Sequence, residues 1–532
     1  LTVQIRKDEV YGNPAEIGLK QALFYEIYPQ SFRDTNGDGV GDLPGILEKL
    51  DYIQGLGFNA IWMNPCYLSP FGDAGYDVQD YKQIAPRYGT MADMEKLIAE
   101  MHRRGMHLLL DLVPGHTSEE HEWFLKSSQK EPNEYSDRYI WTTPDTKIVF
   151  GLNKARGTRE GLYHYNFYPI QPSLNYGFAK VTQPWQTPAG APAVQKTIEG
   201  VKDIIRFWLQ KGVDGFRVDM AFSLVKDDGP GRPETIKVWQ KIFPDIYREF
   251  PEAAFVSEWG VPSESIPAGF NMDFYLQMNA QGFSKLFDFG DPEDLDATPF
   301  FDPRGKGDPK VFAEEYTDFL AKTKGKGYIC LITGNHDIFR RPKSIRDLDI
   351  KLAYAFIYTM PGIPFLYYGD EIGMRQINDL YPVEGSMFRT GARTPMQWDT
   401  GKNAGFSTAE KDDLYLPLDP DENRPNVAQE EQDPNSILNF VKEIIALRKE
   451  NPALGNTADF RILFAQENTY PLVYEREGSG QKLIVAVNPA ARACEATLPH
   501  PVGDILYSLG GKVDASGCTL QMEGESFVIY QV

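Results

Sequence analysis

The chain has 532 residues, of which 42% are hydrophobic and 13% aromatic, enough to bury a large core divided between two or three domains. Its 54 basic and 75 acidic residues give a net charge of -21, which disfavours nucleic acid or an anionic membrane surface as a partner. A neutral substrate is compatible with this charge. No stretch reaches the roughly 18 uninterrupted apolar residues that span a bilayer, so we expect no membrane partner.

Cysteine usage and the start of the chain leave the location open. The four cysteines are far apart and lack CxxC spacing, so we expect plain buried thiols, with Cys494 and Cys518 the one pair to test for a disulfide. The first twenty residues lack an apolar signal core. Because the chain begins at Leu1 rather than Met, a processed secreted or periplasmic protein and a cytoplasmic one both stay open.

Strands and helices alternate over the first part of the chain. Residues 23–28, 59–63 and 107–113 are predicted strands, and residues 44–56 and 92–104 are predicted helices. A βαβαβ run of this kind indicates a parallel sheet.

The alternation stops between residues 115 and 192, a region rich in Tyr, Trp, Asn, Gly and Pro, which we interpret as a domain inserted after the third strand. It resumes with a predicted helix over 193–211. Further strands are predicted at 213–216, 254–257, 270–275, 328–333 and 363–368. Eight strands in all predict an α/β fold, a (β/α)8 TIM barrel.

The pattern changes near the end of the chain. After a predicted helix over 434–449, short alternating strands such as 472–475 and 482–487 continue to Val532, which is typical of a small β-sandwich. We therefore expect three domains: the barrel over 1–114 and 193–453, the inserted domain over 115–192, and the C-terminal β-sandwich over 454–532.

Acidic residues follow three of the predicted strands. The segments are Gly215-Phe-Arg-Val-Asp219, Phe255-Val-Ser-Glu258 and Thr333-Gly-Asn-His-Asp337. Because the C-terminal ends of barrel strands meet at one mouth, we expect Asp219, Glu258 and Asp337 to converge there. Any one such residue is more often a helix cap or a salt-bridge partner, but the three together favour sugar chemistry.

Cleavage of an α-glucosidic bond with retention needs one carboxylate to attack the anomeric carbon and a carboxylic acid ~5 Å away to protonate the leaving oxygen. Asp219 fits the first role, since Arg217 projects from the same face of its strand and would lower the pKa of Asp219. Glu258, followed by Trp259, fits the partly desolvated acid. We expect Asp337 and His336 to grip hydroxyls of the sugar ring.

A second site is indicated by spacing near the N-terminus. In the run 34–42 oxygen ligands recur at every second residue around glycines, the arrangement with which one loop wraps a hard cation. The ligands would be Asp34, Asn36, Asp38, Val40 and Asp42. The run starts like an EF-hand, but Gly45 stands at the twelfth position. We expect a structural Ca²⁺, with Mg²⁺ possible; the alternative is a metal-free cluster of Asx-turns.

Seven segments resemble, in order, those of the α-amylase superfamily, glycoside hydrolase family 13. They are residues 57–65, 111–116, 171–175, 215–219, 256–258, 333–337 and 362–371. The runs 392–399, 403–406 and 432–438 further resemble the oligo-1,6-glucosidase group, which also contains α-glucosidases, trehalose-forming enzymes and sucrose isomerases.

This resemblance implies a retaining glycoside hydrolase with Asp219, Glu258 and Asp337 as catalytic residues. It also assigns sugar binding to Tyr76, Asp77 and His116. The expected substrate-binding set is Tyr76, Asp77, His116, Arg217, His336 and Arg393. Several relatives carry a metal loop like the run 34–42.

We favour an exo-acting α-glucosidase that cleaves short α-glucosides through a covalent glucosyl-Asp219 intermediate. The alternatives are a transglucosylase of the trehalose synthase or sucrose isomerase type and an endo-acting α-amylase. A non-catalytic transporter partner is more remote, because such relatives typically lose the acid or the nucleophile and carry a membrane anchor. We expect an oligosaccharide substrate and a monomer.

The chain departs from the family pattern at several positions. Gly115 stands where most relatives have Asn, a side chain that in true α-amylases helps bind calcium between barrel and inserted domain. Ser173 stands where the oligo-1,6-glucosidase group usually has Asp. The pair Met220-Ala221, after the expected nucleophile, leaves the linkage open, and an insertion over 183–192 either shapes the rim of the site or is a rigid surface loop.

Overall fold

Eight parallel strands form one sheet in the order β11-β10-β9-β8-β5-β2-β1-β12 in the computed structural model, which describes residues 18–287, 298–340 and 345–532. A bridge between Ile332 and Phe365 joins the two ends of the sheet. The strands are β1 (Phe24–Ile27), β2 (Ala60–Met63), β5 (His107–Leu112), β8 (Gly215–Val218), β9 (Ala254–Ser257), β10 (Met272–Phe274), β11 (Tyr328–Cys330) and β12 (Phe365–Tyr367). The predicted barrel is confirmed.

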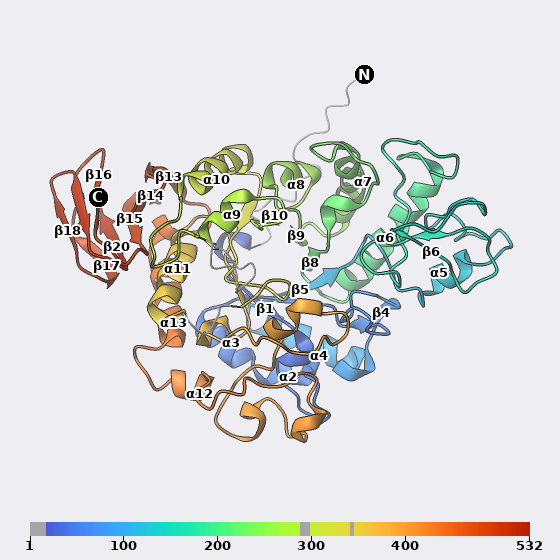
Figure 1. The fold of residues 1–532 in the computed structure, drawn as a ribbon, viewed down its shortest axis with the longest axis horizontal. Helices are drawn as coiled ribbons and strands as arrows, with labels where there is room; N and C mark the ends of the chain where they lie inside the picture. Colours follow the sequence, from blue (N-terminus) through green and yellow to red (C-terminus); the bar gives the residue numbers. More distant parts are fainter. Residues whose placement is uncertain (1–17, 288–297, 341–344) are drawn as a thin grey trace.

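Helices surround this sheet, and every residue of β1, β2, β8 and β9 is buried because the strands pack on both faces (Figure 1). The helices that follow or precede barrel strands are α2 (Leu43–Glu48), α3 (Leu50–Leu56), α4 (Met91–Arg103), α6 (Pro192–Gln210), α7 (Pro233–Glu249), α8 (Pro262–Ala268), α10 (Lys310–Thr323), α11 (Asp347–Thr359) and α13 (Ile437–Glu450). The helix predicted over 44–56 is two helices, because Lys49 leaves the helical conformation with φ -100° and ψ 6°. Within the described ranges, no helix has the length and apolarity needed to cross a bilayer.

The segment between β5 and α6 leaves the barrel as predicted and has little regular structure. It contains α5 (Glu122–Ser127) and a two-stranded sheet of β6 (Leu152–Asn153) and β7 (Tyr163–His164) (Figure 1). Aromatic packing replaces long elements in its core, where the rings of Phe124 and Trp141 stack with centroids 5.6 Å apart. The two ends of the segment meet in a bridge between His116 and Ser173. The exact domain limits stay a prediction.

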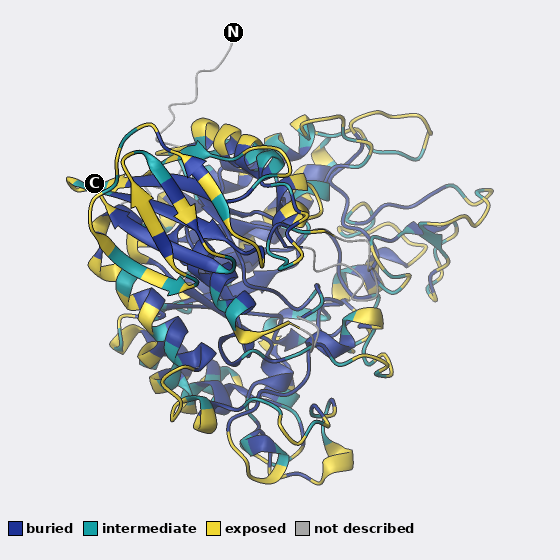
Figure 2. Ribbon diagram, turned by 60° about the vertical axis from the view of Figure 1, so that its left-hand side comes forward, coloured by how far each residue is buried: buried dark blue, intermediate teal, exposed yellow. Residues whose placement is uncertain are grey.

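Two antiparallel sheets complete the chain and confirm the predicted β-sandwich. Their orders are β13-β14-β15-β20-β17 and β16-β19-β18. The strands are β13 (Asp459–Phe464), β14 (Leu472–Gly478), β15 (Gln481–Asn488), β16 (Cys494–Thr497), β17 (Ile505–Gly510), β18 (Val513–Ser516), β19 (Thr519–Met522) and β20 (Ser526–Gln531). Figure 2 shows buried strand faces turned toward the interior and exposed segments on the outside. All four cysteines are free; Cys66 and Cys330 are buried, whereas Cys494 and Cys518 are partly exposed and not bonded to each other.

Two buried arginines anchor the barrel to this C-terminal domain. Arg448 on α13 donates to the side-chain oxygen of Asn456 in the C-terminal domain at 2.8 Å, and to the carbonyl oxygens of Tyr358, Met360 and Gly362 within the barrel, over 2.7 to 2.8 Å. Arg476 on β14 donates to the carbonyl of Thr359 in the same segment. Burial lowers the pKa of Arg448 to about 9, and the nearby charge of Arg476 lowers it further. The cations are tolerated there because several main-chain dipoles solvate each of them.

Replacing Arg448 should therefore destabilise the whole chain. We expect Arg448→Met to lower the free energy of unfolding by about 3 kcal/mol, because three buried carbonyl groups lose their donor. Urea unfolding followed by tryptophan fluorescence measures the change. Arg103→Met is the matched control: Arg103 is exposed and pairs with Glu100 on the same helix, so it should unfold like the parent. Equal stability of both variants would contradict the anchoring role.

Candidate active site

The guanidinium of Arg217 is the centre of the site. It is 1% exposed, and its Nη1 donates to Asp111 Oδ1 and to Asp219 Oδ1, both at 2.9 Å. Its Nη2 lies 3.0 Å from Glu258 Oε1. The parallel register pairs Asp111 on β5 with Arg217 on β8, and β8 pairs with β9, so the three strand ends converge. The structure thus brings Asp219 and Glu258 together as predicted.

The backbone after β8 completes the grip on Glu258. Its Oε2 accepts a hydrogen bond of 2.8 Å from the main-chain N–H of Met220. Met220 has φ 41°, in the left-handed region that residues other than glycine seldom adopt. This conformation lets the main-chain N–H after the nucleophile fix the second carboxyl group.

Burial raises the pKa of Asp219 to about 7 and the pKa of Glu258 to about 8. Arg217 lowers the pKa of both groups, but a single guanidinium facing three buried carboxylates does not offset their desolvation and mutual repulsion. Arg217 therefore lowers the pKa of Asp219 as expected, but desolvation outweighs this effect and the pKa lies above its usual value. The order of the two values still favours an ionised Asp219 beside a protonated Glu258.

Asp337 lies in an opposite electrostatic environment. Its Oδ1 accepts hydrogen bonds from Arg389 at 2.5 Å and from Arg393 at 3.0 Å, and its Oδ2 lies 3.2 Å from His336 Nε2. Burial raises the pKa of Asp337, but His336 and the two arginines together hold it well below its usual range. Asp337 is thus a permanent anion able to accept hydrogen bonds from sugar hydroxyls.

Tyr76 and His336 form one wall of the site. Their rings stack with centroids 5.5 Å apart, and the Tyr76 hydroxyl lies 2.7 Å from His336 Nε2 and 3.0 Å from Asp111 Oδ2. On the other ring nitrogen, His336 Nδ1 lies 2.9 Å from Glu26 Oε1 and 3.1 Å from Asn64 Nδ2.

Sequence reasoning missed Asp111, Glu26, Asn64 and Arg389 as parts of this network. A signal existed for two of them. Glu26 and Asp111 interrupt otherwise apolar buried strands, and a charge in such a strand needs a partner inside the barrel.

Asp77 and His116 are not placed as free sugar ligands. Asp77 is fully buried and accepts main-chain hydrogen bonds from Gly72 at 2.7 Å and Asp73 at 2.9 Å, which closes the turn before Tyr76. His116 is 2% exposed, and both its ring nitrogens contact protein atoms. Their roles in sugar binding stay predictions; the observed contacts position the loop that carries Tyr76.

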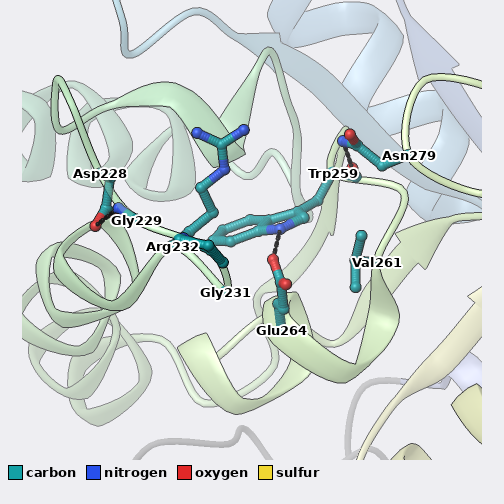
Figure 3. Close-up of a pocket in the computed structure, with 9 residues that line it drawn as sticks. Asp228, Gly229, Gly231, Arg232, Trp259, Val261, Glu264 and Asn279 are labelled. Atoms are coloured by element: carbon teal, nitrogen blue, oxygen red, sulfur yellow. Dashed lines mark hydrogen bonds between the residues drawn. The ribbon is translucent and has the colours of Figure 1, made fainter.

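A polar cavity of about 440 Å³ lies between the loops that follow β8 and β9. Trp259, the residue after Glu258, donates from Nε1 to Glu264 at 2.9 Å, and Asn279 Nδ2 donates to the Trp259 carbonyl at 2.6 Å. Figure 3 shows the Trp259 ring between the side chains of Arg232 and Glu264. The cavity therefore adjoins the chain segment that carries the expected acid.

The predicted metal ligands share one loop, and their chemical types fit a hard cation. As placed, however, Asp34 accepts main-chain hydrogen bonds from Asn36, Gly37 and Gly39. Asp42 caps α2 by accepting from the main-chain N–H of Gly45, and it also accepts a hydrogen bond from Thr35. The Asn36 side chain accepts from the main-chain N–H of Asp38, and the Asp38 side chain accepts from the main-chain N–H of Val40. Within the described ranges, no three His, Cys, Asp or Glu side chains are grouped to hold a metal. Calcium stays a prediction, and these Asx-turns are the alternative.

A (β/α)8 barrel that presents two buried carboxyl groups on one guanidinium at its mouth defines the chain as a glycoside hydrolase. Residues 26–457 match the family model of the α-amylase catalytic domain. The chain therefore belongs to the α-amylase family, glycoside hydrolase family 13.

Known relatives cover nearly the whole chain. It is 31% identical to the oligo-1,6-glucosidase of Parageobacillus thermoglucosidasius, over 91% of this chain and 92% of that protein. It is 33% identical to the trehalose synthase/amylase of Mycolicibacterium smegmatis, over 87% and 81%. Among solved structures, the trehalulose synthase of Pseudomonas mesoacidophila MX-45 superposes with a TM-score of 0.78 at 28% identity, over 96% of this chain and 99% of that one.

The pKa values predict a narrow pH optimum. With the predicted roles, a nucleophilic Asp219 must be ionised and an acid Glu258 protonated, so the rate should rise as pH passes about 7 and fall as it passes about 8. Glu258→Gln should lower kcat/KM on a disaccharide by ~10²–10⁴-fold. On an aryl α-glucoside with an acidic leaving group, Glu258→Gln should recover much of the rate, and its pH–rate profile should no longer fall at alkaline pH. Asp219→Asn should be inactive on both, and a nearly full rate in either variant on the disaccharide would show that the pair is misassigned.

Chelation tests the metal loop. If Ca²⁺ binds the run 34–42, adding it at about 100 times its Kd should raise the unfolding free energy by about 2.7 kcal/mol. Differential scanning fluorimetry with EDTA and then excess Ca²⁺ measures this as a reversible shift. Asp38→Asn should reduce the shift, and an identical melting curve under all conditions would favour the metal-free Asx-turns.

Proposed function

We propose that this chain is an exo-acting, retaining α-glucosidase that releases glucose from short α-glucosides. The observation that carries the proposal is the shared contact of Asp219 and Glu258 with Arg217, which holds the two carboxyl groups close together. Retaining glycosidases need a separation of only about 5 Å, whereas inverting ones leave room for a water.

The chemistry follows from this geometry in two steps. Asp219 attacks the anomeric carbon while Glu258 gives its proton to the leaving oxygen, so the glycosidic bond breaks as the glucosyl-Asp219 ester forms. The Glu258 carboxylate then takes a proton from water, which attacks the same carbon and releases Asp219. Two inversions give net retention.

An exo mode is supported by contacts that close one side of the site. The guanidinium of Arg389 donates to Asp337, forms an ion pair with Asp73 at 3.7 Å, and donates to the Gly385 carbonyl at 3.2 Å. Tyr168 of the inserted segment donates to the same carbonyl at 2.5 Å. These bonds join three loops beside Asp337, so a sugar held by Asp337 would be the terminal unit of its chain.

The leaving group would lie on the side of Glu258, since this acid must reach the leaving oxygen. The polar cavity of about 440 Å³ is lined by Trp259, the residue after Glu258, and not by Glu258 itself (Figure 3). Sites for small ligands of ~300–1,000 Å³ are usual, so this space supports a short oligosaccharide. The similarity to oligo-1,6-glucosidases supports the same class of substrate.

A transglucosylase is the second candidate. The similarity to trehalose synthase/amylase and to trehalulose synthase supports it, because such an enzyme differs from a hydrolase in the acceptor that resolves the glucosyl intermediate.

Product analysis distinguishes these candidates. The enzyme is incubated separately with maltose, isomaltose, sucrose, trehalose and maltoheptaose, and products are followed by chromatography and NMR, with Asp219→Asn as the control. We expect free α-glucose from at least one short sugar and little attack inside the heptaose. Isomerised or elongated sugars would replace the proposal with the transglucosylase, and internal cleavage of the heptaose would replace it with an endo-acting enzyme.

A further inference from the structure

Lys226, in the loop after β8, is a half-buried cation that the reaction above does not use. Its ammonium donates to Asn166 Oδ1 at 2.8 Å and to the Ser223 carbonyl at 3.4 Å, both uncharged acceptors. Burial lowers the pKa of Lys226 to about 8. Because an ammonium group only donates, it orients a side-chain amide so that the amide oxygen faces it.

The first partner whose orientation is fixed is Asn166, from the inserted segment. An ammonium can only donate, so the amide atom 2.8 Å from it must be the oxygen. Ser173 Oγ donates to the same oxygen at 2.8 Å. Asn166 Nδ2 therefore faces the other way, toward the Gly115 carbonyl at 2.9 Å and His116 Nδ1 at 3.3 Å.

The second partner is His116, whose tautomer is consistent with the orientation of the Asn166 amide. Because Asn166 Nδ2 donates, His116 Nδ1 must accept and carries no proton. The ring proton then lies on Nε2, which is 3.0 Å from the Tyr76 carbonyl, a group that can only accept. Burial, aided by the charge of Lys226, lowers the pKa of His116 to about 4, so the ring is neutral at ordinary pH.

Two departures from the family pattern surround Asn166. A Cβ atom at Gly115 would lie 2.9 Å from Asn166 Nδ2, so any larger residue there would displace the amide. Ser173 supplies the hydroxyl that donates to Asn166 Oδ1. The arrangement therefore depends on the absence of a side chain at Gly115 and on the hydroxyl of Ser173.

We propose that Lys226 is a positioning residue, which through Asn166 holds His116 as the neutral Nε2–H imidazole that fixes the main chain of Tyr76. Tyr76 in turn contacts Asp111 and His336 in the active site. The effect on turnover rests on the proposed function, but the state of the His116 ring does not.

Asn166→Asp is the sharpest test. It preserves the shape of the side chain and gives Lys226 an ion-pair partner, which offsets in part the lost hydrogen bond to the Gly115 carbonyl, so the fold should be retained. It replaces the donor facing His116 Nδ1 with an acceptor, which forces a proton onto Nδ1. We expect kcat/KM to fall roughly tenfold, the effect of one misplaced hydrogen bond.

The ring itself is read by ¹⁵N NMR of protein labelled at its seven histidines, with the signal assigned by a His116→Gln spectrum. The parent should show a proton on Nε2 alone, and Asn166→Asp a proton on Nδ1. A parent ring protonated on Nδ1, or an unchanged ring in the variant, would overturn the proposal without touching the proposed function. If the His116 proton moves to Nδ1 in Asn166→Asp and the rate stays at the parent value, the role of the His116 tautomer in turnover would be overturned.

Lys226→Met and Lys226→Arg separate positioning from mere packing. The methionine cannot donate, so Asn166 Oδ1 keeps only the Ser173 donor; a fraction of the His116 rings should then carry the proton on Nδ1 and kcat/KM should fall, whereas arginine should restore both in large part. The matched control is Asp227→Asn, which alters the neighbouring charge at an exposed site with φ 51° that asparagine tolerates; it should behave like the parent. Equal loss in the methionine and arginine variants, with an unchanged His116 signal in both, would show that Lys226 acts only in packing.

Discussion

One interaction organises this molecule: a single buried guanidinium, that of Arg217, faces Asp111, Asp219 and Glu258 at the mouth of the barrel. One positive charge does not neutralise three carboxyl groups, so desolvation raises the pKa of Asp219 and Glu258 to near neutral pH. Across the pocket the balance is reversed, because two arginines face Asp337. The site thus has one side whose carboxyl groups hold protons near neutral pH and another whose carboxylate stays ionised.

The rest of the fold can be understood as support for that charge arrangement. Parallel register brings the ends of β5, β8 and β9 side by side, which no local sequence preference could do. The loop before Tyr76 is closed by Asp77, and the inserted segment contributes Asn166 and its contacts with His116. Farther away, Arg476 contacts the barrel through the main-chain carbonyl of Thr359, and Arg448 contacts the C-terminal domain through the side chain of Asn456. Buried cations therefore hold separate segments together both at the barrel mouth and at this domain boundary.

The sequence predicted the features that follow from repeated local patterns, and it did not predict those that depend on residues from other segments of the fold. All eight barrel strands were predictable, because each is a short apolar run between helices, and so was the sandwich of alternating strands. The helix over 44–56 was predicted as one piece, since a break at Lys49 has no Gly or Pro to mark it. Arg217 was identified correctly as the partner that lowers the pKa of Asp219, but the larger opposing effects, desolvation and the charges of Asp111 and Asp337, arise from other segments and were not visible in the sequence.

By itself, the sequence determined the fold class, the strand ends that carry Asp219, Glu258 and Asp337, and the family to which the chain belongs. These depend on periodicity and on short motifs, which are local properties of the chain. Only the tertiary structure decided which carboxylate meets which cation, that Asp77 and His116 make internal contacts, and that Lys226 lies against Asn166. The physical reason is that burial and charge interactions act through space over a few ångströms, between residues that can be more than a hundred positions apart in the chain.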